Sequence, residues 1–238
     1  MFENDDYSQI AENLILNLTK LPLVKIDREK FLRKELSTYF KGDLIEEAIL
    51  TSPKQAQIPR DIIDKIADGC IFNETTQATL TSVAAGLPGG WAMAGTIPAD
   101  MMQLYAHVLR VAQKLVYLYG WADIFSDGTD EGTTALLMVL LAVALSVNGA
   151  TSILSAIAKS TSNQLPKTIA KTALTKTAWY PLLKKMSGYV GVKLTKDTFA
   201  KSLSKVIPVI GGLTSGGVTL LSFIPMANRL KKHLREFY

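Results

Sequence analysis

The sequence has few of the residues that build most metal and redox centres. It contains one cysteine, Cys70, so no disulfide can form within the chain, and only two histidines, His107 and His233. A zinc site made of cysteine and histidine ligands is therefore excluded, and the single thiol favours a reducing, cytosolic setting. Residues 1–9 carry three acids and no basic residue, so we expect no secretory signal peptide.

The common catalytic and nucleotide-binding motifs are also missing. Gly86–Gly90 is rich in glycine, but the lysine and hydroxyl residue of a phosphate-binding loop do not follow it, and Pro88 removes an amide donor. No Gly-x-Ser-x-Gly motif occurs. The acids from Asp123 to Glu131 lack the spacing of a calcium loop, which indicates a solvated acidic loop. We therefore expect no cofactor, no metal and no assigned catalytic residue.

Charged residues make up 20% of the chain, below the usual quarter or so, and the mean hydropathy is +0.19. Three runs, 75–99, 133–158 and 206–228, contain no charged residue. Each is long enough to cross a bilayer, which takes about 20 residues, but prolines and glycines interrupt the first and third. The middle run is continuous until Asn148–Gly149. Buried helices of a soluble bundle and hairpins inserted in a membrane both remain open.

The periodicity predicts an all-α protein, a compact multi-helix bundle with apolar central hairpins broken by glycine and proline. Asp27 can cap an amphipathic helix that ends at Gly42, and Asp43 can cap the next one. No stretch alternates polar and apolar residues as a strand does. We expect amphipathic helices in residues 1–57 to pack on a helical domain of residues 58–238, with both forming one folding unit.

The charge is divided unevenly along the chain. Residues 1–74 hold 10 basic and 14 acidic residues, whereas residues 159–238 hold 14 basic and 2 acidic ones. A basic segment with Trp and Tyr at its boundary is typical of a helix lying on anionic lipid headgroups. Nucleic acid is not expected, because no binding motif is present and lysine outnumbers arginine. The candidate contacts with anionic lipid are Lys167, Lys171, Lys176, Trp179, Lys184, Lys185, Lys193 and Lys196.

The segment from Ile97 to Gly120 is expected to form one helix, capped by Thr96 and stopped by Gly120. Its polar residues recur at steps of three and four, so they share one stripe of the helix surface. The stripe either faces solvent or faces inward as a paired polar network, in which His107 could respond to pH. The stripe consists of Asp100, Gln103, His107, Arg110 and Lys114.

The same region carries a likeness to a known family. The chain resembles the EcsC family, from about Ile58 to Leu230, in its glycine–proline turn, its stripe-bearing helix and its C-terminal glycine-rich block. The matching motifs are Leu87-Pro88-Gly89-Gly90, Ile97-Pro98-Ala99-Asp100, Gln103-Leu104-Tyr105, His107, Arg110 to Leu115, Tyr117 to Trp121, Val206 to Gly212, Gly216-Gly217 and Met226 to Lys231.

The resemblance implies a bacterial helical protein linked to membranes, because the family takes its name from a gene beside an ABC transporter that influences secretion. It brings no catalytic residues. The leading hypothesis is a non-enzymatic accessory protein, peripheral to or partly inserted in the cytoplasmic face of a bacterial membrane, whose partner is an anionic membrane surface or a membrane protein. A soluble bundle holding a lipid or other apolar ligand between Gly86–Gly95 and Gly211–Gly217 is one alternative. An enzyme using Asp100, His107 and Arg110 is another, and the sequence does not indicate the oligomeric state.

Overall fold

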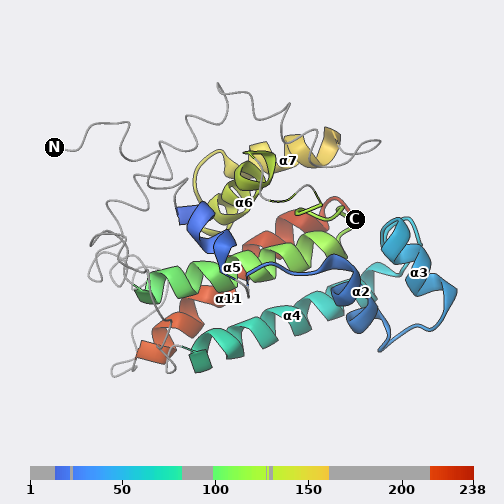
Figure 1. Cartoon of the computed structure of the whole chain (residues 1–238), viewed down its shortest axis with the longest axis horizontal. Helices are drawn as coiled ribbons and strands as arrows, with labels where there is room; N and C mark the ends of the chain where they lie inside the picture. The colour runs from blue at the N-terminus through green and yellow to red at the C-terminus, as the bar shows by residue number, and fades with distance from the viewer. Residues whose placement is uncertain (1–13, 22–23, 82–98, 127, 129–130, 161–214) are drawn as a thin grey trace.

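The computed structural model describes residues 14–21, 24–81, 99–126, 128, 131–160 and 215–238. These residues are all-helical and form a compact bundle (Figure 1). A short helix covers residues 14–20. The longer helices are α2 (Arg28–Leu36), α3 (Asp43–Leu50), α4 (Arg60–Thr81), α5 (Ala99–Leu118), α6 (Glu131–Ala144), α7 (Ala150–Ser160) and α11 (Ser215–Arg235).

Three long helices form the body of the bundle. Helices α4, α5 and α11 each pack against the other two, and in Figure 1 they run along the long direction of the molecule. Helix α6 lies against α5 and α11, and α7 packs on α6. Helices α2 and α3 pair with each other at one end, and α2 also reaches α5. This arrangement places α5 at the centre of the described bundle.

Helix α6 is apolar on every side because it is surrounded by protein. All of its residues from Gly132 to Ala144 are buried. It ends where Ser146 takes a φ of 58°, and its carbonyls are capped by bonds from Ser146 N to Val143 O (3.0 Å) and from Val147 N to Ala142 O (2.9 Å). The uncharged run 133–158 is thus folded as two buried or half-buried helices, α6 and α7, separated at the predicted Asn148–Gly149 break.

The described helices also bear on the question of membrane spans. None of them combines the length and the apolar character needed to cross a bilayer. The 14 residues of α6 rise only about 21 Å, compared with a hydrocarbon core of roughly 30 Å.

Three sequence expectations, two about helix ends and one about a break within a helix, were wrong. Helix α2 is capped by Asp27, whose carboxylate accepts from Lys30 N at 3.0 Å, but it stops at Leu36 and not at Gly42. Gly42, with a φ of 66°, instead precedes α3, so that Asp43 is the first residue of α3 and not its cap. Helix α11 also continues through Pro225, where a break was expected, and includes Gly216–Gly217 in its first turn. Proline removes one helical hydrogen bond, and packing of α11 on α4, α5 and α6 offsets that loss.

Candidate functional site

The polar stripe of α5 faces into the bundle. His107 is buried, and the side chains of Arg110 and Lys114 are 19% and 13% exposed. Gln103 is half-buried. His107, Arg110 and Lys114 therefore face α4, which packs along this side of α5, and not the solvent.

The partner of the stripe is a single carboxylate on α4. Glu74 has no exposed surface, and three residues of the stripe converge on it. His107 Nδ1 lies 2.9 Å from Glu74 Oε2, and Lys114 Nζ lies 2.7 Å from Oε1. Arg110 Nε lies 3.1 Å from Oε1 and 3.2 Å from Oε2. One buried acid thus joins three successive turns of α5 to α4.

The electrostatics of this cluster follow from its geometry. Burial by itself raises the pKa of Glu74, but hydrogen bonds from His107, Arg110 and Lys114 and the charge of Lys114 outweigh it and lower that pKa to about 2. Lys114 Nζ also lies 5.9 Å from the centre of the Phe31 ring, which connects the cluster to α2. Cys70, one turn before Glu74, is buried, and that burial raises the pKa of its thiol to about 12.

The ionisation state of Glu74 limits the chemistry that this cluster can perform. A carboxylate with a pKa of about 2 does not exchange protons near neutral pH. It can orient the imidazole of His107, as carboxylates do beside a general base, but it also forms ion pairs with both Arg110 and Lys114. Removing one partner of such a buried group costs several kcal/mol, so the arrangement is suited to fixing α4 against α5.

Two residues of this polar interior were not predicted from the sequence. Glu74 stands one turn after Cys70 on the apolar face of α4, and an acid at an apolar position was the signal that could have found it. Gln113 is fully buried and holds the segment before α2. Its Nε2 donates to Val24 O at 2.9 Å, and its Oε1 accepts from Ile26 N at 2.9 Å.

Other predicted site residues lie beyond what the structure describes. Asp100 belongs to the first turn of α5, but its side chain is outside the described part. Residues 161–214 lie wholly outside it, and with them all eight candidate lipid contacts from Lys167 to Lys196. The glycine-rich segments proposed to line an apolar cavity, 86–95 and 211–217, lie outside it apart from the first turn of α11, whose side chains are not described.

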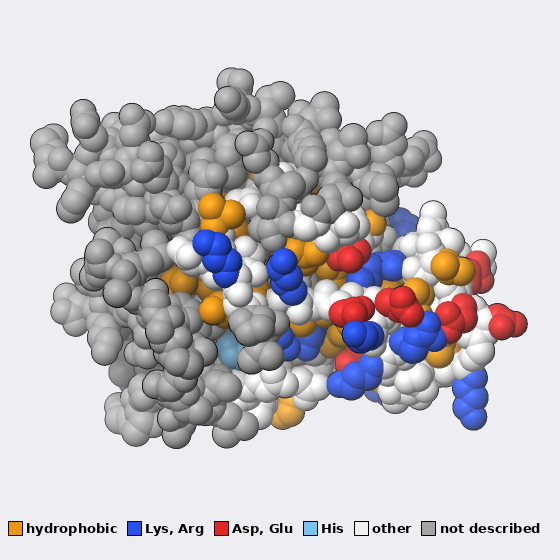
Figure 2. Space-filling view, in the orientation of Figure 1, with side chains coloured by type: hydrophobic (Ala, Val, Ile, Leu, Met, Phe, Trp, Pro, Cys, Tyr) orange, Lys and Arg blue, Asp and Glu red, His pale blue; other side chains and the backbone are white. Residues whose placement is uncertain are grey.

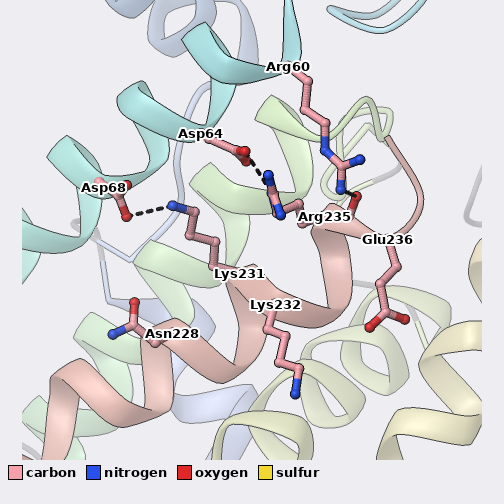
Figure 3. A pocket seen from close by; sticks show the side chains of 8 residues that line it. All are labelled: Arg60, Asp64, Asp68, Asn228, Lys231, Lys232, Arg235 and Glu236. Carbon is pink, nitrogen blue, oxygen red and sulfur yellow. Dashed lines mark hydrogen bonds and ion pairs between the residues drawn. The ribbon is translucent and has the colours of Figure 1, made fainter.

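A second candidate site lies between α4 and α11 (Figure 3). It is an open cleft of about 610 Å³, and each residue that lines it has a polar or charged side chain. Two ion pairs cross it, from Lys231 Nζ to Asp68 Oδ1 and from Arg235 Nε to Asp64 Oδ2, each 2.6 Å long. The remaining lining residues are Arg60, Asn228, Lys232 and Glu236.

The contacts around the cleft give it a structural role. Arg60 Nη2 donates to Arg235 O at 2.7 Å, and Lys54 Nζ donates to Phe237 O at 2.8 Å, so both cap the end of α11. The Tyr119 hydroxyl donates to Asp64 Oδ1 at 2.8 Å. Lys232 forms no ion pair with any described residue. The cleft thus joins α11 to α4, and one exposed lysine stands at its edge.

The acidic loop after α5 is partly described. Asp123 accepts from the Tyr117 hydroxyl at 3.1 Å and from Phe125 N at 2.9 Å, so it closes its own turn. Burial, followed by the charge of Asp123, raises the pKa of Tyr117 well above its usual value. Within the described residues, no three carboxylate, histidine or cysteine side chains are grouped as a metal site requires.

Comparison with known proteins adds no assignment. The chain matches no protein-family model, no curated protein and no solved structure.

Proposed function

We propose that this chain is a helical accessory protein, without an enzymatic reaction of its own, that binds the anionic cytoplasmic face of a bacterial membrane from the surface. Its resemblance to the EcsC family supports a place beside an ABC transporter or a secretion system. Residues 159–205 are the proposed contact with the lipid headgroups.

The separation of charge carries this proposal. Residues 159–205 contain ten lysines and a single acid, Asp197, whereas the first 74 residues have a net charge of −4. At the end of the molecule formed by α2 and α3, acidic side chains lie among Lys and Arg side chains (Figure 2). Each lysine close to an anionic surface contributes about 1 kcal/mol of binding free energy, so several together support stable but salt-sensitive attachment.

The packing of the apolar helices supports attachment at the surface. The most continuous uncharged run of the sequence supplies α6, whose residues from Gly132 to Ala144 are buried among α5, α7 and α11. Bringing α6 out to lipid would separate it from all three helices. Attachment through exposed lysines would leave these helix contacts intact. Binding at the membrane surface therefore agrees best with the described bundle.

Vesicle co-sedimentation tests this mode directly. Replacing Lys184, Lys185, Lys193 and Lys196 with Glu is expected to weaken binding to vesicles containing phosphatidylglycerol at least a hundredfold, because four favourable charges become repulsive. A matched variant carries the same four changes at Lys20, Lys30, Lys34 and Lys41, all exposed in the acidic third.

The matched variant distinguishes the effect of where the lysines lie from the effect of the net charge of the chain. It alters the total charge equally, so it is expected to retain most of the binding if residues 159–205 form the contact. Equal loss in both variants would mean that binding depends only on net charge, and unchanged binding in the first variant would contradict the proposal.

A further inference from the structure

The turn between α6 and α7 holds the only Asn-Gly pair of the sequence, Asn148-Gly149. Both residues are exposed, whereas Val147 before them and Ala150 after them are buried. Ala150 N donates to Val147 O at 3.1 Å, and Gly149 has a φ of 91°, as the third residue of a type II turn requires. The pair is thus the exposed tip of a turn whose two flanks are fixed in the core.

The peptide group that joins Asn148 to Gly149 makes no hydrogen bond to any described residue. The bonds that frame the turn use other atoms, since Val147 N donates to Ala142 O at 2.9 Å and Gly149 O accepts from Ile153 N at 3.2 Å. The Asn148 side chain has no partner among the described residues either. Rotation of this peptide group therefore breaks no hydrogen bond of the described fold, and glycine has no Cβ to restrict it.

An asparagine amide followed by such a free glycine nitrogen can react with its own backbone. Gly149 N gives up its proton to water or hydroxide and attacks Cγ of Asn148, a new C–N bond forms, and the side-chain nitrogen leaves as ammonia. The product is a five-membered succinimide ring. Water then opens this ring at either carbonyl and leaves an aspartyl or an isoaspartyl residue. The sum is hydrolysis of one amide, with no oxidation or reduction.

We propose that Asn148 is a site of spontaneous covalent modification, at which the side-chain amide becomes an aspartyl or isoaspartyl carboxylate with water as the co-reactant. The modification adds a negative charge just before α7, whose first turn holds no acid. Negative charge is favourable at the N-terminus of a helix, so the aspartyl product is expected to keep the fold. This inference concerns the α6–α7 turn alone and does not depend on the membrane proposal.

Peptide mapping by mass spectrometry, during incubation of the folded full chain at mildly alkaline pH, tests the site. Asn73 and Asn228 are matched internal controls, because both are exposed but lie inside helices, α4 and α11. Asn148 is expected to be converted roughly tenfold faster than either control, or more, since the nitrogen that follows it is unbonded and belongs to glycine. Conversion of Asn148 at the rate of the two controls would overturn the proposal.

Comparison with the chain unfolded in urea tests whether the folded turn leaves the peptide group free. Folded and unfolded chains are expected to convert Asn148 at rates within about tenfold of each other, a barrier difference of at most about 1.4 kcal/mol. A larger difference would show that the folded turn holds this peptide group in place, and it would overturn the proposal.

Asn148→Gln tests the assignment to this residue. Its side chain is one methylene longer, so the five-membered ring cannot form, and the variant is expected to lose the more acidic form that isoelectric focusing detects in the incubated wild type. An acidic form that persisted at the wild-type rate in this variant would place the reaction at another residue and contradict the proposal.

Discussion

Glu74 is the residue on which the described interior most depends. It is a fully buried carboxylate, and hydrogen bonds from three basic side chains of α5 keep it ionised. An ion in a protein interior is tolerated only when it is paired and fully hydrogen-bonded. The cluster therefore fixes how α4 and α5 lie against each other, because a shift of either helix would leave charges without partners.

This pairing predicts how stability depends on acid. The pKa of Glu74 is about 2 in the folded chain, below its ordinary value near 4.5, so the folded state binds this proton less readily than the unfolded state. The stabilisation is complete above pH 4.5 and is lost as pH falls toward 2. It amounts to something on the order of 3 kcal/mol.

Glu74→Gln is expected to remove that part of the acid dependence. It should also cost about 3–5 kcal/mol at pH 7, since Arg110 and Lys114 would lose their buried counter-ion. Urea unfolding at several pH values from 7 to 2.5 measures both effects. If the variant and the wild type lost stability in parallel below pH 4.5, Glu74 would not be the group that titrates.

Substitution by alanine is expected to change the free energy of unfolding in opposite directions at two glycines. Gly69→Ala is expected to raise the free energy of unfolding by about 0.5–1 kcal/mol, because the site is helical and open. Gly120→Ala is expected to lower it by about 1–2 kcal/mol, since Gly120 has a φ of 95° and its Cβ would lie 3.4 Å from Lys54 Cβ. Thermal unfolding of dilute protein compares them, and a stabilising Gly120→Ala would show that a side chain fits this turn without strain.

At the scale of elements, Arg28 joins the α2–α3 pair to the end of α5. Its Nε donates to Trp121 O at 3.1 Å, and its Nη1 and Nη2 donate to Ile49 O at 2.6 Å and Thr51 O at 3.2 Å. The planar guanidinium reaches both elements at once, which a single ammonium group cannot do. The carbonyls at the end of α3 also favour a cation.

Arg28→Lys is therefore expected to lower the free energy of unfolding by about 2 kcal/mol, through lost hydrogen bonds to carbonyls that are in part buried. Arg33→Lys is the matched control. Arg33 pairs with Glu29 and Glu46 on the surface of α2 and α3, where ion pairs contribute little. Denaturant unfolding of both variants checks the contrast, and equal effects would show that Arg28 has no special role.

Several elements were predictable because their signals are local. Gly120 stops α5 as expected, with bonds from Gly120 N to Tyr117 O and from Trp121 N to Val116 O. The break between α6 and α7 also follows from a short polar stretch, Ser146 to Gly149. Such caps depend on only a few neighbouring residues.

The partner of the α5 stripe was not predictable in the same way. A period of three and four identifies a polar line on a helix, but it does not show what the line faces. Glu74 is 33 residues from His107 and 40 from Lys114, and only packing of α4 on α5 brings them together. The predicted break at Pro225 and at the glycines of α11 was wrong for a related reason. The contacts of α11 with other helices outweigh the low helix propensity of proline and glycine.

At the scale of the whole molecule, the chain combines a paired, helical core with a strongly uneven charge. The buried apolar helices account for much of the high hydropathy, so that hydropathy alone is weak evidence for insertion. Residues 161–205, which hold nine of the ten lysines of the proposed contact, lie outside the described residues. Under the proposed function, the partner of this basic segment is an anionic surface.

The most direct test of peripheral membrane attachment is to fractionate cells that contain the tagged full-length protein and to wash the membrane pellet first with high salt and then with carbonate. The proposed function predicts that the protein sediments with membranes and is released by salt, since screening removes most of the attraction of exposed lysines. Resistance to both washes would show inserted apolar segments. Recovery in the first soluble fraction would contradict membrane association altogether.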